Sequence, residues 1–429
     1  MTAAAAAVPS ARSPLLIVVV VCIFFYISVV TNVIGALIPE VIRVYRLSLT
    51  QASMLPFCFF LAYGVMSAPA GALRDRYHDK PILAASFAIT AFACLLFALR
   101  PAYWSVTPTL FVIGAAMAVL QVVINPLLQK AGGEEHFAFY STLGQLVFGT
   151  GSFLAPHLYS ATMRPGAALS WPPWLRSATP EETPWVALYW LFAAAAGLAV
   201  VGLSALRFPA AAPAPPEERG TWSGYASLLG SPMVWLYFAS IFAYVGSEQG
   251  TANWISQFLS EYHGADPRTT GAAVLSGFWG LMTAGCVIGM IALKLADSRK
   301  VLIVASFGAL LSLTLALFGP RRAAVLAFPL IGLFASVMWP VIFSLALNSV
   351  ARLQGSFAGL LCTGIVGGAI MPFAIGRLGD AAGLRAGMCL LYLSFGWVAA
   401  VGFWARPLVS NATLGKRART GSPEFAPPA

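Results

Sequence analysis

Charged residues are scarce in this chain. Asp, Glu, Lys and Arg make up only 9% of its 429 residues, whereas hydrophobic residues make up 59%. Soluble globular domains carry about 25% charged residues, so this composition excludes an ordinary soluble fold. Apolar runs of about 18 residues or more, each long enough to cross a bilayer as a helix, recur along the sequence. We therefore expect an all-α membrane protein embedded in the lipid bilayer.

Motifs that would support catalysis are also missing. The six cysteines show no CxxC and no Cys/His spacing typical of a metal site. No nucleophile–base pair and no phosphate-binding loop is apparent. The net charge of +10 comes from basic residues dispersed over many segments, whereas nucleic-acid binding needs them gathered on one face. These absences argue against an enzyme, a cofactor, a bound metal and a nucleic-acid partner.

The apolar runs number twelve and divide into two sets of six. Between the sets lies FPAAAPAPPEERG, from Phe208 to Gly220, whose prolines are incompatible with a packed helix. We predict twelve transmembrane helices in two six-helix halves, in a monomeric protein. The expected domains are an N-terminal tail (1–13), a first half (14–207), a cytoplasmic linker (208–230), a second half (231–405) and a disordered cytoplasmic tail (406–429).

The lysines indicate the orientation of the chain. If both termini are cytoplasmic, all five lysines lie on the inner side, in agreement with the positive-inside tendency (Lys80, Lys130, Lys294, Lys300 and Lys416). We therefore predict a multi-pass protein with both termini in the cytoplasm. The longest external loop, residues 164–185, is expected to be a surface lid or an interfacial segment.

The ten residues GALRDRYHDK join two of the apolar runs and resemble the loop between the second and third helices of the major facilitator superfamily. The matching positions are Gly71, Leu73, Asp75, Arg76 and Lys80, while His78 and Asp79 depart from the pattern. The resemblance implies a solute transporter whose two halves rock. It assigns conformational gating to Gly71, Asp75, Arg76 and Lys80. Asp75 would cap a helix of the other half, as a carboxylate near a helix N-terminus does, with Arg76 as its partner.

Longer stretches resemble one family within that superfamily. They are SVMWPVIFSLAL (residues 336–347), GLLCTGIVGGAIMP (359–372) and YVGSEQGTANW (244–254). Together they are similar to the fucose–galactose–glucose:proton symporter family. The resemblance implies a secondary active transporter of the bacterial inner membrane, which moves a hexose or related sugar by alternating access together with a cation.

Glu248 is the one acidic residue well inside an apolar run. A charge at the bilayer centre costs ~3 kcal/mol on insertion scales, so such a residue usually faces a cavity or a partner. Gly246 and Gly250 flank it and predict an interrupted helix that opens its backbone to a ligand. We predict that Glu248 couples transport to a proton or accepts a hydrogen bond from the substrate. The alternative is a structural acid bonded to a neighbouring helix.

Neutral polar side chains within the runs would complete a sugar site, because buried hydroxyl groups need paired donors and acceptors. Hydrogen bonding between helices is the alternative use of such amides. A tryptophan would stack on a sugar ring or simply pack. The candidates for substrate binding are Asn32, Gln121, Asn125, Gln145, Glu248, Gln249, Asn253 and Trp339.

The coupling ion is left open by the sequence. The acidic positions of the symporter family fall on Gly35 and Gln121, and neither residue titrates. Three alternatives remain: a proton carried by Glu248, another cation such as sodium, or an uncoupled facilitator or exporter of a different small solute. Glu40 is expected to be a surface residue. A transporter-like sugar receptor would need a sizeable folded cytoplasmic extension, for which the linker and tail are too short.

Overall fold

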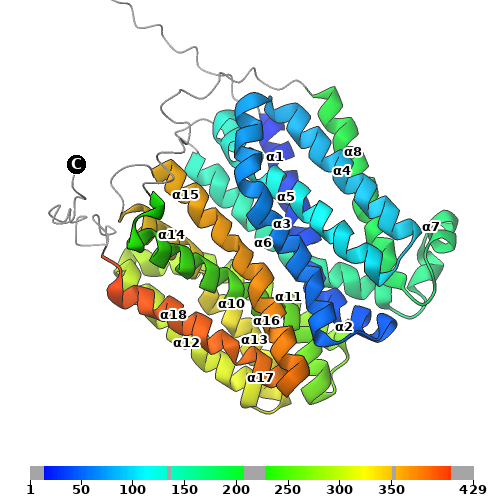
Figure 1. Cartoon of the computed structure of the whole chain (residues 1–429). Coiled ribbons are helices and arrows are strands. Elements are labelled where there is room, and N and C mark those ends of the chain that lie inside the picture. The colour runs from blue at the N-terminus through cyan, green and yellow to red at the C-terminus, as the bar shows by residue number, and fades with distance from the viewer. Residues whose placement is uncertain (1–13, 133–136, 207–227, 350–353, 407–429) are drawn as a thin grey trace, which may run out of the picture.

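A computed structural model describes residues 14–132, 137–206, 228–349 and 354–406. These residues form helices and no strand, and the helices gather into two groups (Figure 1). Within this part of the chain, ten segments are long and apolar enough to cross a membrane. Two more helices, α6 and α10, are 27 and 32 residues long and carry more polar side chains. With these two, the bundle has twelve membrane-length segments, and the predicted all-α fold of two six-helix halves is confirmed.

The first half, which we call the N-half, is described over residues 14–132 and 137–206. Its first segment consists of α1 (Pro14–Asn32) and α2 (Ile34–Tyr45), which meet at Val33. The other long helices are α3 (Leu49–Arg76), α4 (Asp79–Leu99), α5 (Tyr103–Gly132), α6 (Phe137–Met163) and α8 (Ala187–Ala205). The segment between α6 and α8 contains η2 (Ala167–Ser170), α7 (Pro173–Ala178) and η3 (Pro184–Val186).

The second half, or C-half, is described over residues 228–349 and 354–406. It begins with α10 (Pro232–His263), a π-helical turn η5 (Pro267–Gly271), α11 (Ala272–Leu295) and α12 (Ser298–Phe318). Its last three segments are each built from pieces. These are α13 (Arg321–Ala335) with α14 (Met338–Leu347), then α15 (Gln354–Thr363), η6 (Gly364–Val366) and α16 (Gly367–Ala382), then α17 (Leu384–Met388) and α18 (Leu390–Trp404). The predicted tails and most of the predicted linker lie outside the described residues.

Local sequence explains where several helices begin and end. Ser48 starts α3 with a capping box: its hydroxyl accepts the backbone N–H of Gln51, and the Gln51 side chain accepts the N–H of Ser48. Asp297 caps α12 by accepting the backbone N–H of Arg299 at 2.9 Å. Helix α10 ends at Gly264, whose φ of 58° lies in the left-handed region that glycine adopts without strain.

The two ends of the bundle are distinguished by the chain termini. We call the end that holds Pro14 and Trp404 the terminal end, and the opposite end the far end. Successive segments run antiparallel, so the turns that follow α2, α6, α10 and α16 all lie at the far end. Figure 1 shows α2 and α17 at that end, away from α15.

The halves meet along a seam formed by three helix pairs: α3 with α16, α6 with α11, and α2 with α10. Close approaches fill this seam on its far-end side. The rings of Phe57 and Phe373 lie 5.3 Å apart, and His157 Nδ1 lies 2.7 Å from Ser276 Oγ. A Cβ on Gly35 would lie 2.7 Å from the carbonyl oxygen of Ala252. The far end of the seam is therefore closed.

Towards the terminal end the same helix surfaces lose their cover. The close approaches reach Gly64 of α3, beside Val366, and Gly149 of α6, beside Thr283. Two turns further along α3, a Cβ on Gly71 would meet nothing within 4 Å. One turn further along α6, Gln145 is exposed. The structure thus has its seam closed at the far end and uncovered at these two positions nearer the terminal end.

Candidate functional site

Glu248 lies near the middle of α10, and this helix is continuous. It runs unbroken from Pro232 to His263, so the predicted interruption at Gly246 and Gly250 is wrong. The two glycines instead allow neighbouring helices to approach. A Cβ on Gly246 would lie 3.1 Å from Met371 of α16, and one on Gly250 would lie 2.9 Å from Leu391 of α18. Small residues at such helix contacts are common in membranes.

Both carboxylate oxygens of Glu248 accept hydrogen bonds from side chains of α10 itself. Tyr244 Oη, one turn earlier, donates to Glu248 Oε2 at 2.5 Å, and Gln249 Nε2 donates to Oε1 at 3.0 Å. These two bonds do not tie α10 to a neighbouring helix. The side chain is half-buried, and each carboxylate oxygen can accept a further hydrogen bond. The Glu248 carboxylate is therefore held in place and can still accept a hydrogen bond from a hydroxyl group or bind a proton.

An aromatic surface continues from Tyr244 onto α14. The ring centroid of Trp339 lies 6.1 Å from that of Tyr244, and Phe343 stacks on Trp339 at 5.8 Å with 18° between the ring planes. The helical segment breaks at Ser336 and Val337, just before α14 presents Trp339. Aromatic faces beside a carboxylate and an amide suit a sugar, which has apolar C–H faces and hydroxyl edges.

Gln249 and Asn253 are buried where α10 meets the N-half. Asn253 Nδ2 donates to the carbonyl oxygen of Gln249 at 2.8 Å and to Gln249 Oε1 at 3.3 Å. The Cα of Asn253 would lie 3.2 Å from a Cβ on Gly35 of α2. A Cβ on Gly368 of α16 would lie 3.2 Å from Gln249 and 3.1 Å from Phe60 of α3. Two of the predicted residues thus lie on the seam, and contacts through Glu248 and Tyr244 join them to Trp339.

Asn32 joins two helices of the N-half. Its Nδ2 donates to the carbonyl oxygen of Ser28 at 3.1 Å and to Ser152 Oγ of α6 at 2.9 Å. Ser28 and Ser152 in turn share a hydrogen bond of 2.8 Å. Asn32 is only 4% exposed, and its Oδ1 has no hydrogen-bond partner among the described residues. The amide therefore holds α1 against α6, and one buried acceptor is left unpaired.

The other candidates of the N-half are less well defined. Gln121 is half-buried on α5, and Gln145 is exposed on α6 beside the uncovered part of the seam. Helix α5 continues through Asn125 and Pro126, but the side chain of Asn125 lies outside the described residues. A role for these residues in substrate binding stays a prediction.

The predicted gating loop is anchored to its own half by Lys80. Its Nζ donates to the carbonyl oxygens of Ser204 at 3.0 Å and Leu206 at 2.6 Å, at the C-terminal end of α8. Arg74 pairs with Asp79 at 3.3 Å. The side chains of Asp75 and Arg76 lie outside the described residues, so capping by Asp75 stays a prediction.

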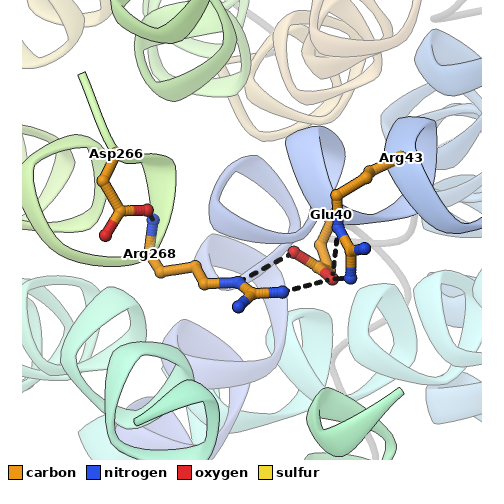
Figure 2. A network of polar contacts seen from close by, with 4 residues as sticks. All are labelled: Glu40, Arg43, Asp266 and Arg268. Atoms are coloured by element: carbon orange, nitrogen blue, oxygen red, sulfur yellow. Dashed lines mark hydrogen bonds and ion pairs between the residues drawn. The ribbon is translucent and has the colours of Figure 1, made fainter. Parts of the chain in front are cut away.

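Glu40 is buried at the far end, and its predicted surface position is wrong. Its side chain is only 2% exposed. Arg268 of the C-half donates to both carboxylate oxygens, from Nε to Oε2 at 3.2 Å and from Nη2 to Oε1 at 3.0 Å. Arg43 also donates to Oε1, at 3.1 Å from Nε. Figure 2 shows Arg268 reaching Glu40, while Asp266 stays beside the backbone of Arg268. This bidentate pair joins the halves.

This pair borders a depression in the surface at the far end. Residues of α2 and α6 from the N-half, and of α10 and η5 from the C-half, line a depression of about 650 Å³ beside Glu40. The close approaches of the seam thus lie beside a surface depression to which both halves contribute residues.

Two residues of these contacts were missed by sequence reasoning. Tyr244 precedes Glu248 by four positions, and this spacing places two side chains on one helix face, so the signal was available. Asp380, near the end of α16, accepts the backbone N–H groups of Leu49 and Thr50 of α3, each at 2.8 Å. Its partners lie more than 300 positions away in the chain, and the signal available for Asp380 was the pattern Gly-x-Leu-x-Asp that residues 376–380 share with residues 71–75.

Comparison with known proteins gives matches over most of the chain. A model of the Major Facilitator Superfamily matches residues 19–365. A glucose/galactose transporter of Brucella abortus (strain 9-941) is 30% identical over 388 residues, which cover 88% of this chain and 91% of that protein. The L-fucose-proton symporter of Escherichia coli (strain K12) is 22% identical over 381 residues, covering 84% and 86%.

Solved structures with the same fold are also found. A crystal structure of the E. coli fucose:proton symporter has a TM-score of 0.64 at 20% identity, covering 92% of this chain and 99% of that one. A bacterial homolog of the human lysosomal transporter Spinster, inward-facing and occupied, has a TM-score of 0.71 at 15% identity, covering 93% and 97%. At these identities the likeness shows a shared fold.

Proposed function

Because this chain belongs to the Major Facilitator Superfamily, we propose that it is a secondary active transporter of a hexose or related sugar. The observation that carries this proposal is the contact set on α10 and α14. There, the Glu248 carboxylate and the Gln249 amide lie beside the rings of Tyr244 and Trp339. The names of the relatives, a glucose/galactose transporter and an L-fucose-proton symporter, point to the same class of substrate.

Alternating access is the mechanism that this arrangement supports. Glu248, Gln249 and Asn253 lie on α10, which contacts the N-half through α2. With the seam closed at the far end and uncovered nearer the terminal end, the site would exchange with one side of the membrane only. Rocking of the halves would then expose it to the other side.

The orientation follows from the charge pattern: we propose that both termini are in the cytoplasm, because all five lysines then face inward. In that orientation the far end is the outer face, and the structure corresponds to an inward-facing state. The bacterial relatives support a location in the inner membrane. A monomeric state stays a prediction.

Proton coupling through Glu248 is the coupling that we favour. The two acidic positions of the symporter family are Gly35 and Gln121 in this chain, and neither residue can carry a proton. Glu248, an acid within an apolar run, is then the residue that we expect to bind and release the proton during the cycle. A second candidate function is uncoupled facilitation. It is favoured by Gly35, because this position packs against the backbone of Ala252 and has no side chain that could carry a proton. Sodium coupling is the remaining alternative.

The substrate is tested by counterflow in proteoliposomes. Vesicles loaded with unlabelled glucose, galactose or fucose are diluted into the labelled sugar, and transient accumulation of label reports a shared carrier without any ion gradient. We expect counterflow with at least one of the three sugars and none with an unrelated polyol such as glycerol. Absence of counterflow with every hexose would overturn the sugar assignment and favour another small solute.

The gating loop leads to a kinetic prediction. We expect Asp75→Asn to slow turnover while leaving the sugar concentration for half-maximal exchange within about twofold of that of the wild type. The charge of a carboxylate cap stabilises a helix N-terminus by only about 0.3–1 kcal/mol. Here that stabilisation would apply to one conformation of the transport cycle, so its loss changes the rate of the cycle more than the binding of the sugar. Initial counterflow rates over a range of sugar concentrations separate the two quantities, with Glu261→Gln, an exposed acid of α10, as the control. A normal maximal rate in Asp75→Asn would refute this role.

A further inference from the structure

Asp380 holds the far end of the seam through a contact between the two halves. We infer that Asp380 is a positioning residue of the transport cycle, a counterpart of Asp75 that keeps the far end closed when the terminal end is open. This inference rests on the proposed alternating-access function. It concerns α3 and α16, which lie against each other along the seam (Figure 1).

The first turn of α3 receives part of its cap from the other half of the protein. The first backbone N–H groups of a helix have no partner within the helix and need an external acceptor. Ser48 supplies acceptors for Gln51 and Ala52. Asp380 accepts the two that remain, with its Oδ1 on the N–H of Leu49 and its Oδ2 on that of Thr50, both at 2.8 Å. The cap of α3 is complete only while α16 stays in this position.

The sequence around Asp380 repeats that of the gating loop. Residues 71–75 read GALRD and residues 376–380 read GRLGD, so both follow the pattern Gly-x-Leu-x-Asp. Each copy lies in the last turns of its helix, since α3 ends at Arg76 and α16 ends at Ala382. The two helices form one pair across the seam and point their C-terminal ends towards opposite ends of the bundle. Each end of the seam therefore holds one copy of the motif.

The glycines of the two copies are in opposite states. A Cβ on Gly376 would lie 2.7 Å from the carbonyl oxygen of Leu49 and 2.9 Å from Ser53 Oγ, so this copy is pressed against α3. A Cβ on Gly71 would meet no atom of the described residues within 4 Å. The glycine of one copy is packed where the seam is closed, and the glycine of the other has no cover among the described residues. This is the pattern expected of two latches that alternate.

The Glu40–Arg268 pair acts at another edge of the same closed end. It joins α2 to η5, whereas Asp380 joins α16 to α3. The two contacts differ in chemistry, since one is a buried ion pair and the other is a helix cap. Removal of the cap is the cleaner test, because a single change leaves no buried charge without its partner.

The test is a distance measurement across the far end by electron spin resonance. Spin labels are placed at Arg100 of the N-half and Arg322 of the C-half, both exposed at the far end, in the full-length chain with its native cysteines replaced. The samples are reconstituted in lipid without sugar, so the result does not depend on the substrate. We expect Asp380→Ala to raise the ratio of open to closed far ends by about tenfold, as loss of a helix cap would.

Two further variants complete the design. Asp297→Ala removes a cap of the same kind that lies within the C-half, on Arg299 at 2.9 Å, and should leave the distances unchanged. Asp380→Asn keeps one acceptor and should give an intermediate shift, and it serves as the test if Asp380→Ala does not fold. If the distances in the Asp380 variants match those of the wild type, the inference that Asp380 keeps the far end closed is refuted. A shift in the distances without counterflow of any sugar would instead support the latch and refute the substrate.

Discussion

Glu248→Gln is expected to abolish concentrative sugar uptake while sugar exchange continues. Glutamine has nearly the same size and keeps a carbonyl oxygen for the Tyr244 hydroxyl, but it does not bind and release a proton. Replacing the carboxylate of Glu248 by an amide removes its charge and weakens the hydrogen bonds that this side chain accepts. Hydrogen bonds with one ionised partner contribute about 1.5–3 kcal/mol each. We therefore expect accumulation driven by a pH gradient to vanish and the apparent affinity in counterflow to fall by roughly tenfold or more.

The control for this variant lies on the same helix. Glu261→Gln removes an exposed acid near the far end of α10 and should leave both assays unchanged. Accumulation at the wild-type level in Glu248→Gln would remove Glu248 from the coupling role. Loss of counterflow together with accumulation would instead make Glu248 a substrate-binding residue and leave the coupling ion to be found.

Gly35→Ala is expected to prevent full closure of the far end. Its added methyl group would lie 2.7 Å from the backbone oxygen of Ala252, which has no rotamer by which to move away. Overpacking of this kind costs about 1–3 kcal/mol, and it acts only on the state in which α2 and α10 touch. The expected result is a shift of roughly ten- to hundredfold towards the state open at the far end, with a matching fall in the rate of exchange.

The matched control is Gly197→Ala in α8, where a Cβ meets nothing within 4 Å. The far-end spin-label pair reports the conformational shift, and counterflow reports the rate. Wild-type distances in Gly35→Ala would show that the α2–α10 contact is not part of the closed gate. An unchanged rate with shifted distances would mean that closure of the far end does not limit turnover.

The fold was largely predictable because its main signal is local. Membrane helices must satisfy their own backbone hydrogen bonds, so each apolar run of sufficient length becomes a helix whatever surrounds it. The prolines of Phe208–Gly220 predict a division between the halves near residue 220, and this boundary stays a prediction because these residues lie outside the described part of the chain. What failed was the interruption of α10, because glycine serves two opposite purposes in membrane helices. At Gly246 and Gly250 it allows close packing, and the helical segments are interrupted elsewhere, for example at Val33 and before Trp339.

The site was partly predictable for the same reason. Glu248, Gln249, Asn253 and Trp339 stood out as polar or aromatic residues within apolar runs, and contacts along α10 and α14 connect them. Glu40 was misplaced because Arg268, its partner, is 228 positions away in the chain. Asp380 was missed for a similar reason. Contacts between residues so far apart in the chain leave no periodic pattern in the sequence.

Asn32 shows how a single amide carries two interpretations. Its nitrogen atom makes the interhelical hydrogen bonds that the structural alternative predicted, to Ser28 and Ser152. Its buried oxygen atom is left without a partner, which is costly for a polar group in this environment. The residue therefore fixes α1 against α6 and still offers one acceptor, and its role in substrate binding stays a prediction.

The most direct test of the proposed function is gradient-driven uptake of labelled glucose, galactose and fucose into proteoliposomes. An imposed pH gradient is applied and then collapsed with a protonophore. We predict accumulation above the external sugar concentration that is lost when the gradient collapses. Entry of sugar that only equilibrates, with or without the gradient, would contradict proton symport and establish a facilitator or coupling to another ion.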